Sequence, residues 1–232
     1  RRTQGGRRLT SAPAWAAAAT IHAMPRIAGK ITEQTVLDMK RAATRLIALH
    51  GFEGMNLRML AEEIGLKAGS FYNHIDSKES LLHRLLSDTM HELMAGLDEA
   101  LADAVDPADA LRRFVAFHIE FHAIRRDEVF IGNAELRRLS EAHRAEIVAQ
   151  RDVYEQRLFS ILRAGQAAGQ FAPGDLRTAV RALIAMLSGV CTWYRADGRL
   201  GVKALVRQYT RMAFGCVGAD PALVLSASPR RR

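Results

Sequence analysis

The side chains best suited to chemistry lie between residues 56 and 78, where polar and basic residues are interspersed with a few apolar ones. Arginine and lysine bind phosphate oxygens, while serine, asparagine, tyrosine and histidine can hydrogen-bond phosphates or base edges. The polar side chains that the apolar spacing leaves outermost are those of Arg58, Lys67, Ser70, Tyr72, Asn73, His74 and Lys78. Together they are typical of a surface that binds nucleic acid, although any one of them also fits a solvated helix face.

Two short helices are expected to position these side chains. Asn56 can cap a helix over 57–64, and a second helix is expected over about 68–74, after the three-residue connection Gly65-Leu66-Lys67. Leu57, Leu60, Ala61 and Ile64 can bury one face of the first helix, and Leu66, Phe71 and Ile75 can anchor the second. A short, glycine-containing connection between two short helices is the helix-turn-helix pattern, whose second helix enters the major groove of DNA.

The rest of the chain also shows helical periodicity, which predicts an all-α protein of about nine helices. Ser77 can cap a long helix rich in leucine, and Asp106 before Pro107 is typical of an N-cap with proline at the first helical position. The other helices are expected over 32–51, 127–139, 141–168, 175–195 and 202–214.

Apolar and polar side chains on the later helices predict a small-molecule site. Such sites combine apolar walls with a few polar groups. The candidates are Phe114, Phe117, His118, Phe121, His122, Phe130, Asn133, Trp193 and Arg195. Any single phenylalanine fits an ordinary core equally well. His118 and His122 lie one helical turn apart, but no third ligand can be assigned, so neither a metal nor a cofactor is expected.

Small residues on the helix expected over 175–195 allow another helix to approach closely. We expect this helix and the last one to pair with their two-fold copies as a four-helix bundle, making the protein a homodimer. The candidate interface residues are Ala179, Ala182, Ala185, Gly189 and Tyr209.

The stretch GFEGMNLRMLAEEIGLKAGSFYNHIDSKESLL, residues 51–82, closely resembles the DNA-binding head of the TetR family of bacterial transcriptional regulators. Shared features are Leu60-Ala61, Gly65, Gly69-Ser70, Tyr72, His74 and Ser77-Lys78-Glu79. The resemblance implies that Tyr72, His74 and Lys78 hold phosphates. It implies that Arg58, Asn73 and the segment Lys67, Ala68, Gly69 and Ser70 face the groove.

Three positions depart from the family pattern. Asn56 replaces the usual threonine at the cap, with an equivalent oxygen acceptor. Lys67 and Ala68 stand where the family often has Ser or Thr and then a polar residue, which predicts one more phosphate contact and one fewer base contact. Ile75 replaces a customary phenylalanine, which is a change in the core.

A shorter stretch resembles the TetR regulators that respond to acyl-CoA thioesters. It consists of Thr192-Trp193-Tyr194-Arg195, with Gly198 and Tyr209. This resemblance implies that Arg195 lies near a thioester or a CoA phosphate, and that Trp193 lies near the acyl chain.

The charge is concentrated at the two ends of the chain. The net charge is +8, but residues 1–30 carry six basic residues and no acid, and residues 218–232 end in three arginines. The expected organisation is therefore a disordered basic extension (1–30), a helix-turn-helix domain (31–78), a ligand-binding and dimerisation domain (79–217) and a disordered tail (218–232). The start only superficially resembles a secretory signal, Met24 is the expected natural start, and two cysteines fit a reduced, cytoplasmic protein.

The expected function is that of a ligand-responsive repressor that binds a palindromic operator as a homodimer. A small hydrophobic or acyl-CoA-type inducer would release it, and no membrane partner is expected. The alternatives are a ligand-independent architectural DNA-binding protein and an α-helical enzyme. Against an enzyme, His91-Glu92 begins a zinc-binding HExxH motif, but Ala95 occupies the position of the second histidine. No nucleophile elbow, phosphate loop or dinucleotide fingerprint is present.

Overall fold

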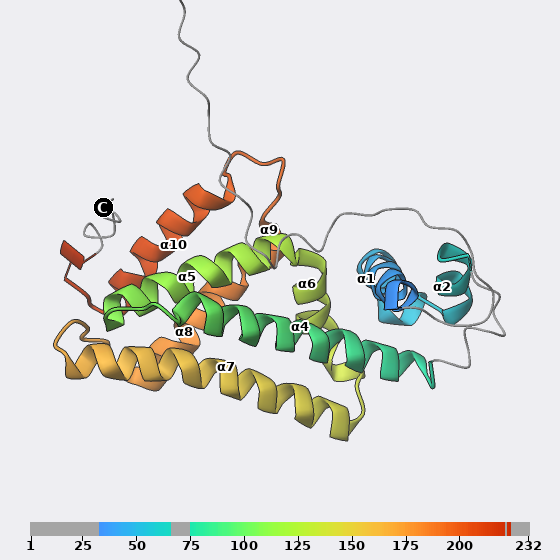
Figure 1. Cartoon of the computed structure of the whole chain (residues 1–232), viewed down its shortest axis with the longest axis horizontal. Coiled ribbons are helices and arrows are strands. Elements are labelled where there is room, and N and C mark those ends of the chain that lie inside the picture. Colours follow the sequence, from blue (N-terminus) through green and yellow to red (C-terminus); the bar gives the residue numbers. More distant parts are fainter. Residues whose placement is uncertain (1–32, 66–74, 221, 224–232) are drawn as a thin grey trace, which may run out of the picture. The chain divides into compact units, whose positions relative to one another are not determined.

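The computed structural model describes residues 33–65, 75–220 and 222–223, and every regular element within them is a helix (Figure 1). This confirms the all-α class for the part of the chain described. The chain divides after Ile31, and the described residues all belong to the second unit. The expected basic extension, the expected helix over 68–74 and residues 221 and 224–232 of the expected tail lie outside the described residues.

Helix α2 begins at its expected cap, whereas α1 runs past its expected end. Helix α1 (Glu33–Gly54) bends at Gly51, whose φ of 71° is a left-handed conformation that glycine adopts without strain. It therefore continues for a bent final turn beyond the expected end. Helix α2 (Leu57–Glu63) begins after Asn56, whose side chain accepts a hydrogen bond from the Met59 N–H at 3.0 Å. The bidentate ion pair from Arg45 to Glu63, with nitrogen–oxygen distances of 2.8 and 3.1 Å, joins α1 to α2.

The next helices begin at the predicted N-caps. Helix α4 (Lys78–Leu101) starts after Ser77, which exchanges hydrogen bonds with Ser80. Helix α5 (Pro107–Ile124) starts after the Asp106 cap. Helix α6 (Arg126–Glu135) is shorter than expected, because the chain tightens into a 3₁₀ turn at Leu136–Arg138 before α7 (Glu141–Ala167).

One expected helix is broken in two. In place of a continuous helix over 175–195, α8 (Leu176–Ser188) ends at Gly189 and a short α9 (Val190–Trp193) follows. Glycine is a poor helix former, so a helix readily ends there. The chain then turns into α10 (Val202–Cys216).

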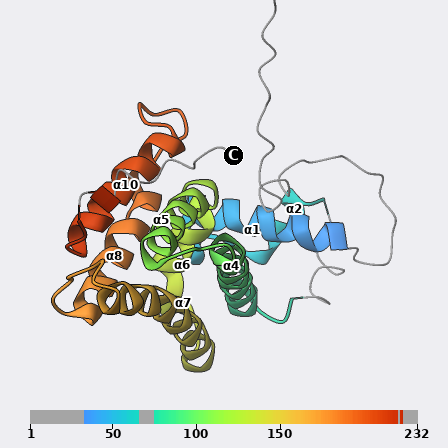
Figure 2. The same cartoon turned by 60° about the vertical axis from the view of Figure 1, so that its left-hand side comes forward.

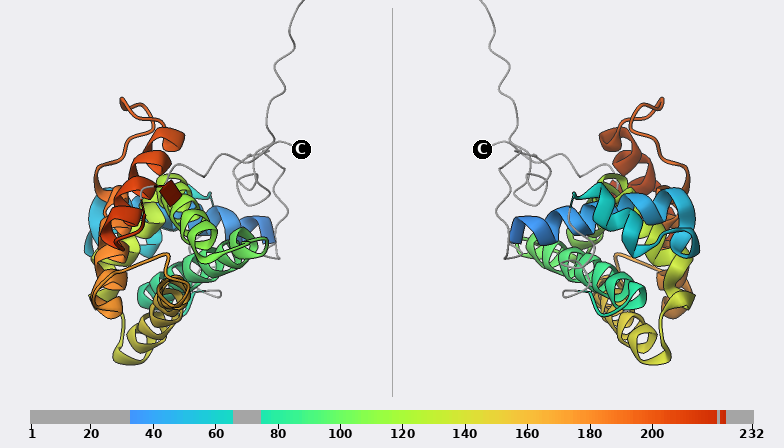
Figure 3. Two further views of the ribbon diagram at one scale, coloured as in Figure 1. Left: turned by 90° about the vertical axis from the view of Figure 1, so that its left-hand side faces the viewer. Right: turned by 90° about the vertical axis from the view of Figure 1, so that its right-hand side faces the viewer.

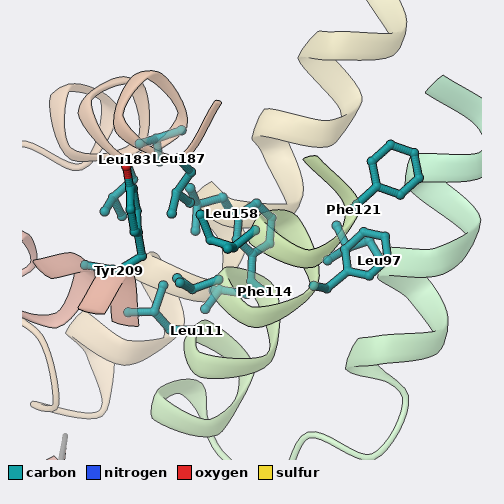
Figure 4. Packing of buried hydrophobic residues seen from close by; sticks show 14 of the residues in the cluster. Leu97, Leu111, Phe114, Phe121, Leu158, Leu183, Leu187 and Tyr209 are labelled. Atoms are coloured by element: carbon teal, nitrogen blue, oxygen red, sulfur yellow. The ribbon is translucent and has the colours of Figure 1, made fainter. Parts of the chain in front are cut away.

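Helix α5 forms the centre of the body, since α4, α7, α8 and α10 all pack against it (Figures 2 and 3). Its buried side chains Leu111 and Phe114 meet Leu158 of α7 and Leu183 and Leu187 of α8 in one apolar cluster (Figure 4). This packing holds fixed the face of α5 that carries the histidines.

Candidate functional site

Three of the predicted DNA-contacting residues fall within the described part of the chain. Asn56 caps α2, and Arg58 is exposed and paired with Glu62 at 2.9 Å on the same helix. Lys78 begins α4. The other seven, which are Lys67, Ala68, Gly69, Ser70, Tyr72, Asn73 and His74, lie outside the described residues, and their contacts stay predictions.

Lys78 has a structural contact that the sequence did not reveal. Its Nζ donates to the Met55 carbonyl at 3.0 Å and lies 3.4 Å from the Glu53 carbonyl. The same ammonium lies 4.3 Å from the centre of the Phe52 ring, which is a cation–π distance. Lys78 thus joins the first turn of α4 to the backbone at the end of α1. An ammonium has three donor hydrogens, so Lys78 has one left for a phosphate, and this contact stays a prediction.

A cavity of about 160 Å³, open to the surface on one side, lies within the body and is lined by α4, α5, α6, α7 and α8. Its wall is mostly apolar and carries a small number of polar groups, as expected of a ligand site. The lining residues are Leu86, Thr89, Met90, Leu93, His118, Phe121, His122, Glu128, Val129, Gly132, Asn133, Ile147, Arg151, Tyr154, Glu155, Ile184 and Ser188. Four predicted ligand contacts, His118, Phe121, His122 and Asn133, are among them.

The other predicted ligand contacts do not line this cavity. Phe114 and Phe117 are buried among other side chains; Phe114 packs behind the cavity against Tyr154, with ring centres 5.3 Å apart. Phe130 and Trp193 are 42 % and 50 % exposed. Arg195 is exposed and forms a two-point ion pair with Asp197 at 3.1 Å. Helix α8 ends at Gly189, before Trp193 and Arg195, so it does not place these two residues beside the cavity.

The polar end of the cavity is a hydrogen-bonded group centred on His118. Its Nδ1 lies 2.9 Å from the Tyr154 hydroxyl, and its Nε2 lies 3.4 Å from Ser188 Oγ. The ring of His122 stacks on that of His118, with centres 3.8 Å apart. Burial lowers the pKa of His122 to about 4 and lowers the pKa of His118 well below its ordinary value, so both rings are neutral at pH 7.

Three charged residues of the cavity wall, Glu128, Arg151 and Glu155, were missed by sequence reasoning. Arg151 donates to the Gly132 carbonyl at 2.9 Å, and burial lowers its pKa. Burial raises the pKa of Glu128, which lies 3.5 Å from Arg125. The spacing of Ile147, Arg151 and Tyr154, three and four residues apart, places them on one helix face and was a usable signal. Among the described residues, no third group accompanies the histidines to form a metal site.

Helix α6 contacts both the cavity and the end of α1. Gly132 and Asn133 line the cavity, and Glu135 accepts the Phe52 N–H at 3.1 Å, just after the bend at Gly51. Arg138, in the following turn, pairs with Glu53 at 2.8 Å. A shift of α6 that accommodates a ligand would therefore move the acceptor on which the end of α1 depends.

A second link joins α4 to the start of α7. Glu79 accepts the Ser140 N–H at 2.8 Å and lies 2.8 Å from His143 Nδ1. Although burial opposes ionisation, these hydrogen bonds hold the pKa of Glu79 below its ordinary value. The first turn of α4 is thus fixed to the body.

The predicted dimer face is only partly available on α8 and α10. Ala182 and Ala185 are exposed, and Gly189 is half-buried. Ala179 and Tyr209 are only 5 % and 8 % exposed, because they pack into the core of the same protomer. Within one protomer these two residues thus offer little free surface to a partner, and their place in a dimer interface stays a prediction.

The stretch Leu176–Trp193 is long and apolar enough to cross a membrane by length and composition alone. About a third of it is buried within the protomer, as in the core helices of soluble proteins that pass the same test. It also carries Arg177 and Arg181, which are exposed. These features fit a helix with one side on its own core and the other side free for a partner.

Two parts of the chain match family descriptions of known proteins. Residues 41–85 match "Bacterial regulatory proteins, tetR family", and residues 104–217 match "Tetracyclin repressor-like, C-terminal domain". The HTH-type transcriptional repressor KstR2 of Mycolicibacterium smegmatis is 27 % identical over 182 residues, which cover 77 % of this chain and 88 % of KstR2.

Solved structures share the same architecture. The TetR family transcriptional regulator PfmR from Thermus thermophilus is 30 % identical, with a TM-score of 0.70, over 75 % of this chain and 96 % of PfmR. AibR, solved in complex with isovaleryl coenzyme A and operator DNA, is 24 % identical, with a TM-score of 0.69, over 78 % of this chain and 97 % of AibR. The second likeness shows a common fold.

Proposed function

This chain belongs to the TetR family of bacterial transcriptional regulators, and we propose that it is a repressor that leaves its operator when a small acyl-CoA-type ligand enters the body. The repressor role is supported by the similarity to KstR2, which carries that description. A regulator that binds chromosomal DNA would act in the cytoplasm.

The proposed DNA contact is the helix-turn-helix that begins at α2. The Asn56 cap, the Arg45–Glu63 ion pair and Lys78 fix α2 against its neighbours on either side. A rigid first helix sets the register of the second one on the phosphates.

The proposed inducer is a thioester whose acyl group is small. An apolar cavity of about 150 Å³ accommodates a benzene ring, so the 160 Å³ found here suits a ring or a short branched chain. This volume is too small for a whole coenzyme A, whose remaining part would have to leave the cavity through its open side. The shared fold with AibR, which was solved with isovaleryl coenzyme A, supports this class of ligand.

The route from ligand to DNA is carried by α6. A ligand that pushes on Gly132 and Asn133 displaces Glu135, two to three residues further along α6, and with it the Phe52 N–H at the end of α1. The ligand shifts the equilibrium only by its difference in affinity for the two arrangements. The hydrogen bond from the Phe52 N–H to Glu135, two residues beyond Asn133 of the cavity wall, is the observation that carries the proposal.

The protein is proposed to act as a homodimer through α8 and α10. Exposed small residues, Ala182 and Ala185, allow two copies of α8 to approach closely. Two recognition helices about 34 to 36 Å apart would then read successive major grooves on one side of the duplex.

The test is a gel shift against the DNA upstream of the protein's own gene and its neighbours. Binding that is released by isovaleryl-CoA or benzoyl-CoA, and not by free coenzyme A, supports the proposal. Binding that no acyl-CoA releases favours the architectural alternative. No binding to any of these segments would contradict the proposed repressor.

A further inference from the structure

His122 has an acceptor atom for which the protein supplies no donor. Its side chain is 4 % exposed and lines the cavity. Its Nδ1 lies 2.9 Å from the His118 carbonyl oxygen. Among the described residues, no group forms a hydrogen bond with its Nε2.

The hydrogen bond to His118 decides which nitrogen of His122 carries the proton. A carbonyl oxygen only accepts, so Nδ1 must be the donor and must hold the hydrogen. In a neutral imidazole, Nε2 is then a lone-pair acceptor. Burial keeps the ring neutral by lowering its pKa to about 4.

The neighbouring polar groups can adapt to a ligand, whereas His122 cannot. His118 lies between the Tyr154 hydroxyl at 2.9 Å and the Ser188 hydroxyl at 3.4 Å. Since each hydroxyl both donates and accepts, either tautomer of His118 is satisfied. The stacked His122 has its tautomer fixed by its own helix. A ligand that covers Nε2 without offering a donor leaves this acceptor buried and unsatisfied, so a ligand that supplies the donor gains affinity over one that does not.

We propose that the cavity selects ligands whose enclosed group carries a hydrogen-bond donor, a hydroxyl on a ring or short chain, which binds Nε2 of His122. This inference deepens the proposed function, because it rests on the use of this cavity as the ligand site. The proposed hydroxyl lies on the acyl group of the inducer, away from the thioester.

Phenol and fluorobenzene are the probes, because they are nearly the same size and only phenol has a donor. Titration calorimetry on the full chain should show phenol binding at least about tenfold more tightly than fluorobenzene. In His122→Phe, which keeps an aromatic ring to stack on His118, the two affinities should fall within about twofold of each other. Equal affinities in the unmodified protein, or an unchanged preference in His122→Phe, would overturn the inference.

A second measurement does not depend on the variant. A proton–nitrogen correlation spectrum of the unmodified protein, labelled with nitrogen-15 in histidine, reports which nitrogen holds the hydrogen. The expected result is one ring protonated at Nδ1 whose Nε2 resonance moves with phenol and stays still with fluorobenzene. If His122 is protonated at Nε2, the inference fails. These fragment tests do not use thioesters or DNA, so their outcome is separate from the release of the operator by acyl-CoA.

Discussion

Acid should weaken the fold through the buried imidazole of His122, and His122→Phe should remove part of that weakness. In the native state burial lowers the pKa of His122 from 6.5 to about 4. The unfolded chain therefore binds a proton that the native state does not, as the pH falls below 6.5. Stability is lost between about pH 6.5 and pH 4, because the unfolded state is favoured by proton uptake.

The size of the effect follows from the two pKa values. Between pH 7 and pH 5 the difference in proton uptake lowers the free energy of unfolding by about 2 kcal/mol through His122 alone. His118 acts in the same direction, because burial also lowers its pKa. The raised pKa of Glu128 makes acid stabilise the native state instead. Glu128 is present in both proteins, so its effect largely cancels when His122→Phe is compared with the unmodified protein.

The assay is urea unfolding of both proteins at pH 7 and pH 5, at one protein concentration. The unmodified protein should lose about 2 kcal/mol more than His122→Phe between the two pH values. Val129→Ala removes an untitratable side chain from the same cavity wall and should lower stability equally at both. Equal pH dependence in His122→Phe and the unmodified protein would refute the assignment of a neutral, buried His122.

Three further substitutions test individual contacts. Asn56→Ala should lower the free energy of unfolding by about 1 kcal/mol because α2 loses its cap, whereas Asn56→Asp should keep it; equal loss in both, measured by urea unfolding, would contradict the capping role. Lys78→Met should lower stability by about 1 to 3 kcal/mol through the lost bonds to α1. If Lys78 also holds a phosphate, the salt dependence of operator binding measured by gel shift should fall by about one unit of slope, and an unchanged slope would exclude that contact. Isovaleryl-CoA is expected to weaken operator binding by a certain factor, and in Glu135→Ala that factor should be about tenfold smaller. Glu135→Gln keeps an acceptor for the Phe52 N–H and should reduce the factor less. An unchanged factor in Glu135→Ala would show that α6 does not link the cavity to α1.

Local capping chemistry made the helix starts predictable. Asn56, Ser77, Asp106 and Asp175 each accept the backbone N–H three residues ahead, as their residue types suggested. Helix ends were harder, because they depend on where the chain must turn to pack. The 3₁₀ turn after α6 and the break at Gly189 illustrate this.

Three predicted residues of α5, His118, Phe121 and His122, line the cavity, but most of its wall could not be predicted. Helix periodicity indicates which residues share a face of one helix, and it does not say which faces of five helices enclose a space. Tyr154 comes from α7, 36 residues beyond His118 in sequence, and like Arg151 it entered the site only through tertiary packing. For the same reason the sequence did not show that Trp193 and Arg195 lie away from this cavity, since their position depends on the end of α8. Their contact with a ligand stays a prediction.

The most direct test of the account is the mass of the protein–DNA complex, measured by sedimentation on an upstream DNA segment that the protein binds. We expect two chains, or a multiple of two, on each palindromic site, and we expect the complex to be lost when isovaleryl-CoA is added. A single chain per site, or a complex that withstands every short-chain and aromatic acyl-CoA, would contradict it.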